Sequence, residues 1–257
     1  MTVSVDRDRH VAAVTLERPE ALNAISGAMA DELADAFRAC AADRETWVVV
    51  LRAAGDRAFC VGADLKERAR FTLADFHANR KQVRGMFEAL RAVPQPSIAA
   101  VFGFALGGGF ELALSCDLVV AAEDAELGLP EARVGLLPAG GGTQLLPRRV
   151  GIARAKELVF TGRRLSAREA ADWGIVQAVV PRAELEDRAM ALAHDICAAS
   201  PVAVRAAKSA IDFAPGAPVS QGMAVEHGAW SVVVASEDRS EGISAFNDRR
   251  GPEWTNR

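Results

Sequence analysis

We expect the chain to be organised around one stretch, Gly103-Phe-Ala-Leu-Gly-Gly-Gly-Phe-Glu-Leu-Ala-Leu-Ser-Cys-Asp117. It follows the apolar run Pro96-Ser-Ile-Ala-Ala-Val-Phe102, and this order predicts a strand, a tight turn and a helix. Gly107, Gly108 and Gly109 have no Cβ, so other backbone can approach them closely. If the helix starts within this cluster, its first amides lack intrahelical partners and can bind an anion or a developing oxyanion.

Glu111 is the only carboxylate within the apolar part of this stretch. It lies three residues after Gly108, so it can share one face of the first helical turn with that amide. The alternative interpretation is a glycine-rich turn that packs against its neighbours, with Glu111 as a favourable first-turn acid. A nucleotide phosphate loop is not predicted, because the glycines lack the Gly-x-Gly-x-x-Gly spacing and no Lys-Ser/Thr pair follows them.

The overall composition is that of a globular enzyme. The 257 residues are 50% hydrophobic and 25% charged, which suffices for one large core, and the net charge of −4 favours neither nucleic acid nor an anionic membrane as a partner. The four cysteines lie far apart, without a Cys-x-x-Cys motif, which predicts reduced thiols. Neither a leader-like N-terminus nor a membrane-spanning run is visible, so we expect a cytoplasmic protein.

The segments around the central stretch alternate strands with helices and then become helical only. The expected strands are a hairpin of 3–5 and 11–16, then 47–52, 118–122 and 176–180. The expected helices are about 27–42, capped by Ser26, then 71–92, 154–162 and 166–173, and a helical region from 183 that breaks at 200–201 and 214–218. This order predicts an α/β core with a helical C-terminal part.

Two glutamates beside glycine clusters are the candidate chemical groups. Glu111 belongs to the first cluster, and Glu131 ends the turn Leu127-Gly-Leu-Pro-Glu131. The four histidines lack metal-ligand spacing, so no metal is expected, and neither a His-Glu-x-x-His motif nor a Gly-x-Ser-x-Gly elbow is present. Two carboxylates in different environments can serve as acid and base. With backbone amides for an oxyanion, this equipment suits chemistry next to a carbonyl.

Several motifs, in order, resemble the enoyl-CoA hydratase/isomerase, or crotonase, superfamily. They are Leu16-Glu-Arg-Pro-Glu-Ala-Leu-Asn-Ala24, Gly62-Ala-Asp-Leu-Lys-Glu67, Ala100-Val-Phe-Gly-Phe-Ala-Leu-Gly-Gly-Gly-Phe-Glu-Leu-Ala113, Leu129-Pro-Glu-Ala-Arg-Val-Gly-Leu-Leu-Pro138, Gly141-Gly-Thr-Gln144 and Asp238-Arg-Ser-Glu-Gly-Ile-Ser-Ala-Phe246. The resemblance covers essentially the whole chain. It implies a crotonase-like α/β spiral of repeated β-β-α units over residues 1–195, and a C-terminal helical region over 196–257 that drives trimerisation.

The resemblance also implies a function. Members bind acyl-CoA thioesters, commonly as trimers or dimers of trimers, and need no cofactor besides the CoA of the substrate. Chains that keep both glutamates add water to a 2-trans-enoyl-CoA and give a 3-hydroxyacyl-CoA, the hydro-lyase step of fatty acid β-oxidation. Isomerases usually keep one of the two glutamates. We therefore expect an enoyl-CoA hydratase.

Carried over by position, the resemblance assigns a role to each site residue. The amides of Ala63 and Gly108 form the oxyanion hole, Glu111 orients or activates water, and Glu131 delivers the proton to Cα. The expected CoA contacts come from the oxyanion-hole residues and from their neighbours in three motifs, namely Ala24 near the adenine end, Ala63, Asp64, Leu65, Lys66, Gly108, Pro138 and Ala139.

Two departures from the family pattern and three alternatives remain. Ala139 stands where the family often has glycine, which requires backbone free of positive φ, and Leu145 replaces a common arginine, which we interpret as a change in surface or interface contacts. The alternatives are an isomerase, a lyase acting on a branched or aromatic acyl-CoA such as methylglutaconyl-CoA or carnitinyl-CoA, and a non-catalytic RNA-binding relative, which the net charge disfavours. Segment 70–95 is expected to shape the acyl pocket.

Overall fold

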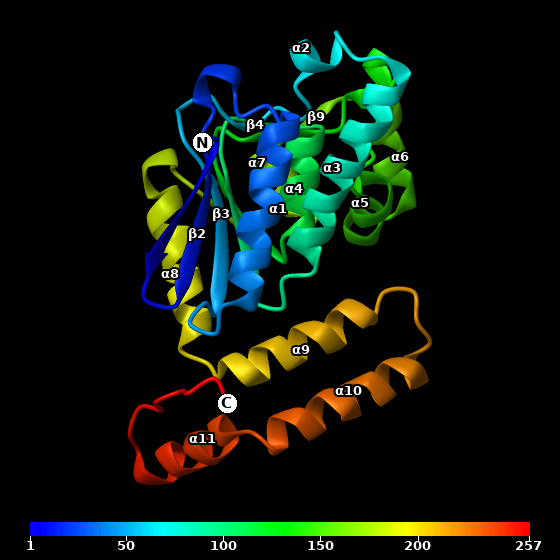
Figure 1. The fold of residues 1–257 in the computed structure, drawn as a ribbon. Coiled ribbons are helices and arrows are strands. Elements are labelled where there is room, and N and C mark those ends of the chain that lie inside the picture. The colour runs from blue at the N-terminus through cyan, green and yellow to red at the C-terminus, as the bar shows by residue number, and fades with distance from the viewer.

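A six-stranded sheet forms the centre of the computed structural model, which describes residues 1–257 (Figure 1). Its strand order is β1-β2-β3-β5-β7-β10, in which β1 is antiparallel to β2 and every other pair is parallel. The strands are β1 Val3–Asp8, β2 Val11–Leu16, β3 Val48–Ala53, β5 Ser97–Val101, β7 Leu118–Ala122 and β10 Ala178–Val180. Val, Ile, Leu and Ala fill β2, β5 and β7 almost without interruption, as strands covered on both faces require.

A second, four-stranded sheet stands beside the first. Its order is β4-β6-β8-β9, where β4, β6 and β8 are parallel and β9 is antiparallel to β8. These strands are β4 Ala58–Cys60, β6 Phe104–Leu106, β8 Glu126–Gly128 and β9 Arg164–Ser166. The chain places β3, β5 and β7 in the large sheet and the next strand, β4, β6 or β8, in the small one. This alternation is the spiral of β-β-α units that the sequence predicted.

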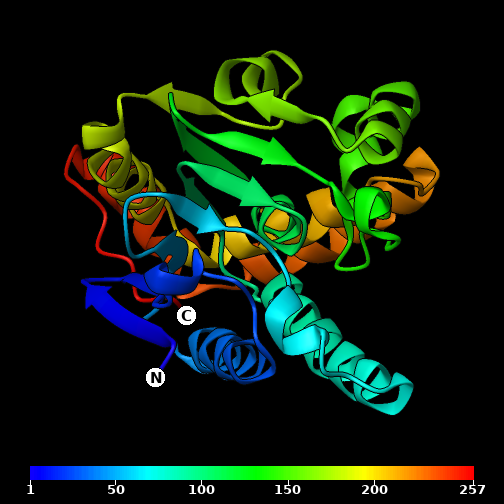
Figure 2. The same ribbon diagram turned by 90° about the horizontal axis from the view of Figure 1, so that it is seen from above.

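Helices cover both faces of the large sheet (Figures 1 and 2). On one face lie α1 Gly27–Ala42 and α3 Leu73–Arg91, which pack against each other, and α4 Gly108–Ser115. On the other face lies α8 Leu185–Cys197, against β3, β5 and β7. The main apolar core fills the first interface, and a smaller one lies under α8. The remaining core helices are short, namely α2 Leu65–Arg68, α5 Gly142–Val150, α6 Ile152–Thr161, α7 Ala167–Asp172 and the 3₁₀ segments Pro19–Ala21, Glu131–Val134 and Arg182–Glu184.

The last three helices form a separate layer, α9 Pro201–Phe213, α10 Val219–Val234 and α11 Glu237–Asp248 (Figure 1). Helices α9 and α10 lie side by side beyond one end of the core. Lys208 on α9 binds the core through Asp117 Oδ2 at 2.7 Å and the Gln95 carbonyl at 2.9 Å. The boundary that we predict between residues 195 and 196 falls in the last turn of α8, and the division into two units stays a prediction.

The longer elements agree with the sequence, and the short strands do not. The predicted helix 27–42 is confirmed with its cap, since Ser26 Oγ accepts from the Met29 amide at 3.2 Å. Strands β4, β6 and β8 lie in segments that were predicted as loops or turns, β9 was not predicted, and α5, which begins at the end of the second glycine cluster (residues 140–142), was missed. Three residues are too few for the two-residue period of a strand to show. The four cysteines are free. None of the helices has both the length and the apolar character needed to cross a membrane.

Candidate active site

The central glycine cluster places an unpaired amide at the start of a helix. Helix α4 begins at Gly108, directly after β6, and the Gly108 amide donates to no acceptor within the protein. Gly107 holds φ 53° and ψ −126°, which a residue with a side chain rarely adopts. A Cβ built there would lie 3.1 Å from Glu131 Oε1. The free amide therefore stands at the positive end of α4, beside a carboxylate from another loop.

Ala63 supplies a second unpaired amide next to the first. The Ile25 amide donates to the Gly62 carbonyl at 2.7 Å, and the Asp64 amide donates to the Ile25 carbonyl at 3.0 Å, which leaves the Ala63 amide without a partner. A Cβ built on Gly108 would lie 3.9 Å from the Ala63 nitrogen. Two neighbouring free amides are the arrangement that binds a developing oxyanion.

Glu111 is buried and held by the second glycine cluster. Its side chain lies one turn into α4, and the residue is 3% exposed. Oε1 accepts the amides of Gly140 at 2.7 Å and Gly142 at 2.8 Å, while Oε2 accepts no hydrogen bond within the protein. Burial raises the pKa of Glu111, and the amides of residues 140–142 oppose that rise by stabilising the charged form. One oxygen is thus fixed, and the other is left for a ligand.

Glu131 has an environment that favours its protonated form. It follows β8 at the start of a 3₁₀ turn, half-buried, and its Oε2 is buried without a hydrogen-bond partner. Burial, with a further contribution from the negative charge of Glu111, raises the pKa of Glu131 to about 7. At neutral pH this carboxyl group can therefore donate a proton, whereas Glu111 has the amides that support a carboxylate. Such a pair can divide the work of acid and base.

The predicted CoA contacts around residue 64 lie together, although not all are free to bind. Ala24 is buried and its carbonyl accepts from Arg18 Nη1 at 2.6 Å. Leu65 and Lys66 open α2 and are exposed. The carboxylate of Asp64 is occupied, because it accepts from the amides of Lys66 and Glu67 at 3.1 Å and from Arg18 Nη2 at 3.1 Å.

The loop before α5 carries the other predicted contacts. Pro138 is buried, and Ala139 is exposed with an amide that has no acceptor in the protein. Ala139 is not among the residues with positive φ, so alanine fits here without strain. Leu145, which we interpreted as a change in surface or interface contacts, has a role within the protein as well. It is half-buried, and its Cδ1 would lie 3.0 Å from a Cβ on Gly141, so it packs against the glycine loop.

Three residues of this region were missed by the sequence reasoning. Arg18 joins Ala24 to Asp64 and was present in a quoted motif without a role. Arg91 donates from Nη1 to the Gly140 carbonyl at 2.8 Å, and a Cβ on Gly140 would lie 2.3 Å from the ring of the buried Phe87. Arg91 and Phe87 both belong to α3, and the helical pattern of this segment contained no signal that distinguished them from its other residues.

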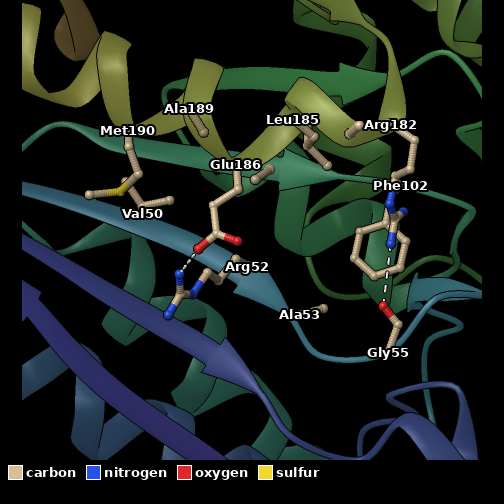
Figure 3. A pocket seen from close by; sticks show the side chains of 12 residues that line it. Val50, Arg52, Ala53, Gly55, Phe102, Arg182, Leu185, Glu186, Ala189 and Met190 are labelled. Atoms are coloured by element: carbon tan, nitrogen blue, oxygen red, sulfur yellow. Dashed lines mark hydrogen bonds and ion pairs between the residues drawn. The ribbon is translucent and has the colours of Figure 1, made fainter.

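A cavity that is separate from these residues lies on the α8 face of the large sheet (Figure 3). It measures about 220 Å³ and contains none of the predicted site residues. Arg182 lies over the Phe102 ring and donates to the Gly55 carbonyl at 3.3 Å, and Arg52 pairs with Glu186. Glu186 is the only acidic side chain that lines this cavity. No group of three His, Cys, Asp or Glu side chains in the protein could hold a metal ion.

Comparisons with known proteins show the family of this chain. The model of the enoyl-CoA hydratase/isomerase family matches residues 6–257. The human enoyl-CoA hydratase domain-containing protein 2, a mitochondrial protein, is 43% identical over 96% of this chain and 86% of its own length. Mouse mitochondrial methylglutaconyl-CoA hydratase is 35% identical over 97% and 81%. A crystal structure of enoyl-CoA hydratase from Bacillus anthracis, 42% identical, covers 100% of both chains with a TM-score of 0.97.

Proposed function

Because the chain belongs to the enoyl-CoA hydratase/isomerase family, we propose that it adds water to a 2-trans-enoyl-CoA and forms a 3-hydroxyacyl-CoA. The observation that carries this proposal is the pair of glutamates in contrasting environments. Glu111 is held by two amides, and Glu131 has an unpartnered oxygen and a pKa of about 7. Glu131 lies beside Gly107, next to the free amide of Gly108, and Glu111 is close enough for its charge to raise the pKa of Glu131.

The two amides act on the thioester carbonyl. When water adds to Cβ, the electrons of the double bond move toward the carbonyl and negative charge develops on its oxygen. The amides of Ala63 and Gly108 donate to that oxygen and stabilise the enolate, and the positive end of α4 adds to their effect. Each donor of this kind is worth about 100- to 1,000-fold in kcat in other enzymes.

The two glutamates move the protons. The free Oε2 of Glu111 orients the water and takes its proton as the oxygen bonds to Cβ, while protonated Glu131 delivers a proton to Cα of the enolate. One water is thus added, and a proton passes from Glu111 to Glu131 by solvent before the next cycle. The free amide of Ala139 can hold the same water.

The substrate enters along the segment that contains Ala24, Leu65 and Lys66. The exposed start of α2 gives the CoA chain a surface beside Ala63. The mouse relative named methylglutaconyl-CoA hydratase makes a branched acyl-CoA the second candidate substrate. The isomerase alternative is weaker, because both glutamates are present.

We also propose that the C-terminal layer forms the interface of a trimer. Its helices expose large apolar side chains that a monomer rarely leaves in water, namely Ile211, Phe213, Val219, Met223, Trp230, Val232, Ile243 and Phe246. A role in β-oxidation and a cytoplasmic location stay predictions.

The test mixes the protein with crotonyl-CoA and follows the absorbance of the conjugated thioester. Wild type should remove the absorbance rapidly, Glu131→Gln should reduce the rate at least 100-fold, and Glu20→Gln, an exposed glutamate with no hydrogen bond, should not change it. Loss of absorbance at the wild-type rate in Glu131→Gln would place the chemistry elsewhere. Binding of CoA thioesters without hydration would indicate another reaction of the family.

A further inference from the structure

Arg18 and Asp64 form a clamp around the backbone that carries the Ala63 amide, and we propose that this clamp positions the oxyanion hole. The inference rests on the proposed function and gives Asp64 a different role from the CoA contact that the sequence predicted. Neither side chain touches the reacting atoms, so both are positioning residues.

The backbone between β4 and α2 makes its backbone hydrogen bonds to one neighbouring segment, residues 22–25. Ile25 pairs with Ala63 in an isolated bridge, with hydrogen bonds of 2.7 Å to the Gly62 carbonyl and 3.0 Å from the Asp64 amide. These two bonds flank Ala63 and set the direction of its free amide. The two segments share one further backbone hydrogen bond, from the Val61 amide to the Leu22 carbonyl at 3.2 Å, and no strand pairing extends the bridge.

Arg18 closes the bridge from both sides. Its Nη1 donates to the Ala24 carbonyl at 2.6 Å, next to Ile25, and its Nη2 donates to Asp64 Oδ2 at 3.1 Å, next to Ala63. The guanidinium therefore ties the residue before one half of the bridge to the residue after the other half. The Arg18 and Asp64 side chains are 20% and 13% exposed, so water screens this pair weakly.

The clamp is itself anchored. The Arg18 amide donates to Asn23 Oδ1 at 2.9 Å, and the Asn23 side chain, which is fully buried, donates to the carbonyls of Ala54 and Ala58 at 3.0 Å. Arg18 thus reaches the bridge from a loop that is fixed to the segment between β3 and β4. A group that links three segments can hold the position of the bridge more firmly than the bridge alone.

Asp64 is fully engaged within the protein. Its Oδ1 caps α2 through the amides of Lys66 and Glu67, and Oδ2 takes Arg18. Although burial opposes ionisation, the amides and Arg18 lower the pKa of Asp64, so the carboxylate stays charged. A carboxylate with three donors has little capacity left for a ligand, and its negative charge would repel the phosphates of CoA.

The test measures how strongly the oxyanion hole polarises a bound thioester. The probe is a chromophoric aryl-enoyl-CoA, whose absorbance moves to longer wavelength when its carbonyl is hydrogen-bonded. Asp64→Asn keeps the shape and removes the charge, and Arg18→Gln removes the ion pair but leaves the α2 cap. We expect each variant to lose at least half of the wavelength shift and about 10- to 100-fold in kcat for crotonyl-CoA, with KM changed less than about threefold. Asp35→Asn, which breaks the exposed Arg38–Asp35 pair on α1, is the matched control.

The double variant should be no slower than the worse single one, because both changes open the same clamp. An unchanged wavelength shift and kcat in Arg18→Gln, or a change in Tm alone, would overturn the inference. So would weaker binding of free CoA by Asp64→Asn with the shift and kcat intact, since that result returns Asp64 to the CoA site. If wild type binds the probe without any shift, the proposed function fails as well, and the two failures are therefore distinguishable.

Discussion

The titration of Glu131 gives the sharpest prediction. If this residue must carry the proton for Cα, the active form is protonated, and its pKa of about 7 sets the alkaline limb of the pH–rate profile. About half of the sites are protonated at pH 7 and about 1% at pH 9. We expect kcat/KM to fall about tenfold per pH unit above pH 8. An ordinary glutamate in the same role would already limit the rate above pH 5.

The same titration predicts how stability depends on pH. The pKa of Glu131 in the folded protein lies above the ordinary value of 4.5. Its contribution to the free energy of unfolding is therefore fully present below pH 4.5 and is lost as pH rises through about 7. This difference corresponds to at most about 3 kcal/mol. Because the side chain is half-buried and partly screened, we expect about 1–2 kcal/mol. Glu131→Gln carries no charge at this position. The variant should therefore unfold about 2–6 °C above wild type at pH 8.5, and at the same temperature as wild type at pH 4.5.

Both measurements use the full chain and one control. Rates of crotonyl-CoA hydration between pH 5.5 and 9.5 give the profile, and scanning fluorimetry at pH 4.5 and 8.5 gives Tm, with Glu20→Gln as the control because this exposed glutamate makes no hydrogen bond. A kcat/KM that stays level from pH 6 to 9 would refute the acid role of Glu131. A Tm difference at pH 4.5 equal to that at pH 8.5 would show that the variant acts through packing, not through charge.

Three further predictions test the surroundings of the site. Glu111→Ala should lower kcat at least 100-fold and leave acyl-CoA binding nearly intact, measured by titration calorimetry, because the carboxylate acts on water. Gly109→Ala should lower the free energy of unfolding in urea by about 2 kcal/mol or more, since its Cβ would lie 2.0 Å from the Cys60 carbonyl oxygen and would displace α4 from β4. Lys208→Met should cost about 1–3 kcal/mol in the same assay by leaving Asp117 without its 2.7 Å partner. An unchanged unfolding midpoint in either of the last two would contradict the packing described.

The sequence predicted the elements that are long enough for their hydrophobic pattern to repeat several times. Helices 27–42 and 71–92 and the C-terminal helices 201–213 and 219–234 contain several turns, so their patterns and breaks were visible. The small sheet could not be predicted from the sequence, because each of its four strands contains only three residues. Their pairing depends on strands distant in the chain, which no local pattern records.

The site was found from motifs, and its electrostatics was not. The resemblance singled out Glu111 and Glu131 among 34 acidic residues. It could not show that two amides bind one oxygen of Glu111 while Oε2 of Glu131 has no partner, because these environments depend on how segments distant in the chain pack together. For Asp64, the motif could not show which partners its carboxylate has within the protein. Its motif suggested a CoA contact, but its neighbours in space occupy the carboxylate.

The missed sheet explains why one site gathers residues from distant motifs. Strands β4, β6 and β8 are parallel neighbours, so their C-terminal ends meet at one edge. Ala63 follows β4, Gly108 follows β6 and Glu131 follows β8, each shortly after the strand ends. Every turn of the spiral therefore delivers one component to that edge, two as free amides and one as an acid. A shift of one residue in the β4–β6 pairing would move Ala63 by about 3.3 Å relative to Gly108 and separate the two donors. The pairing of β4 with β6 is short and irregular, and the clamp of Arg18 and Asp64 lies just beyond the C-terminal end of β4, where it can hold Ala63 in place.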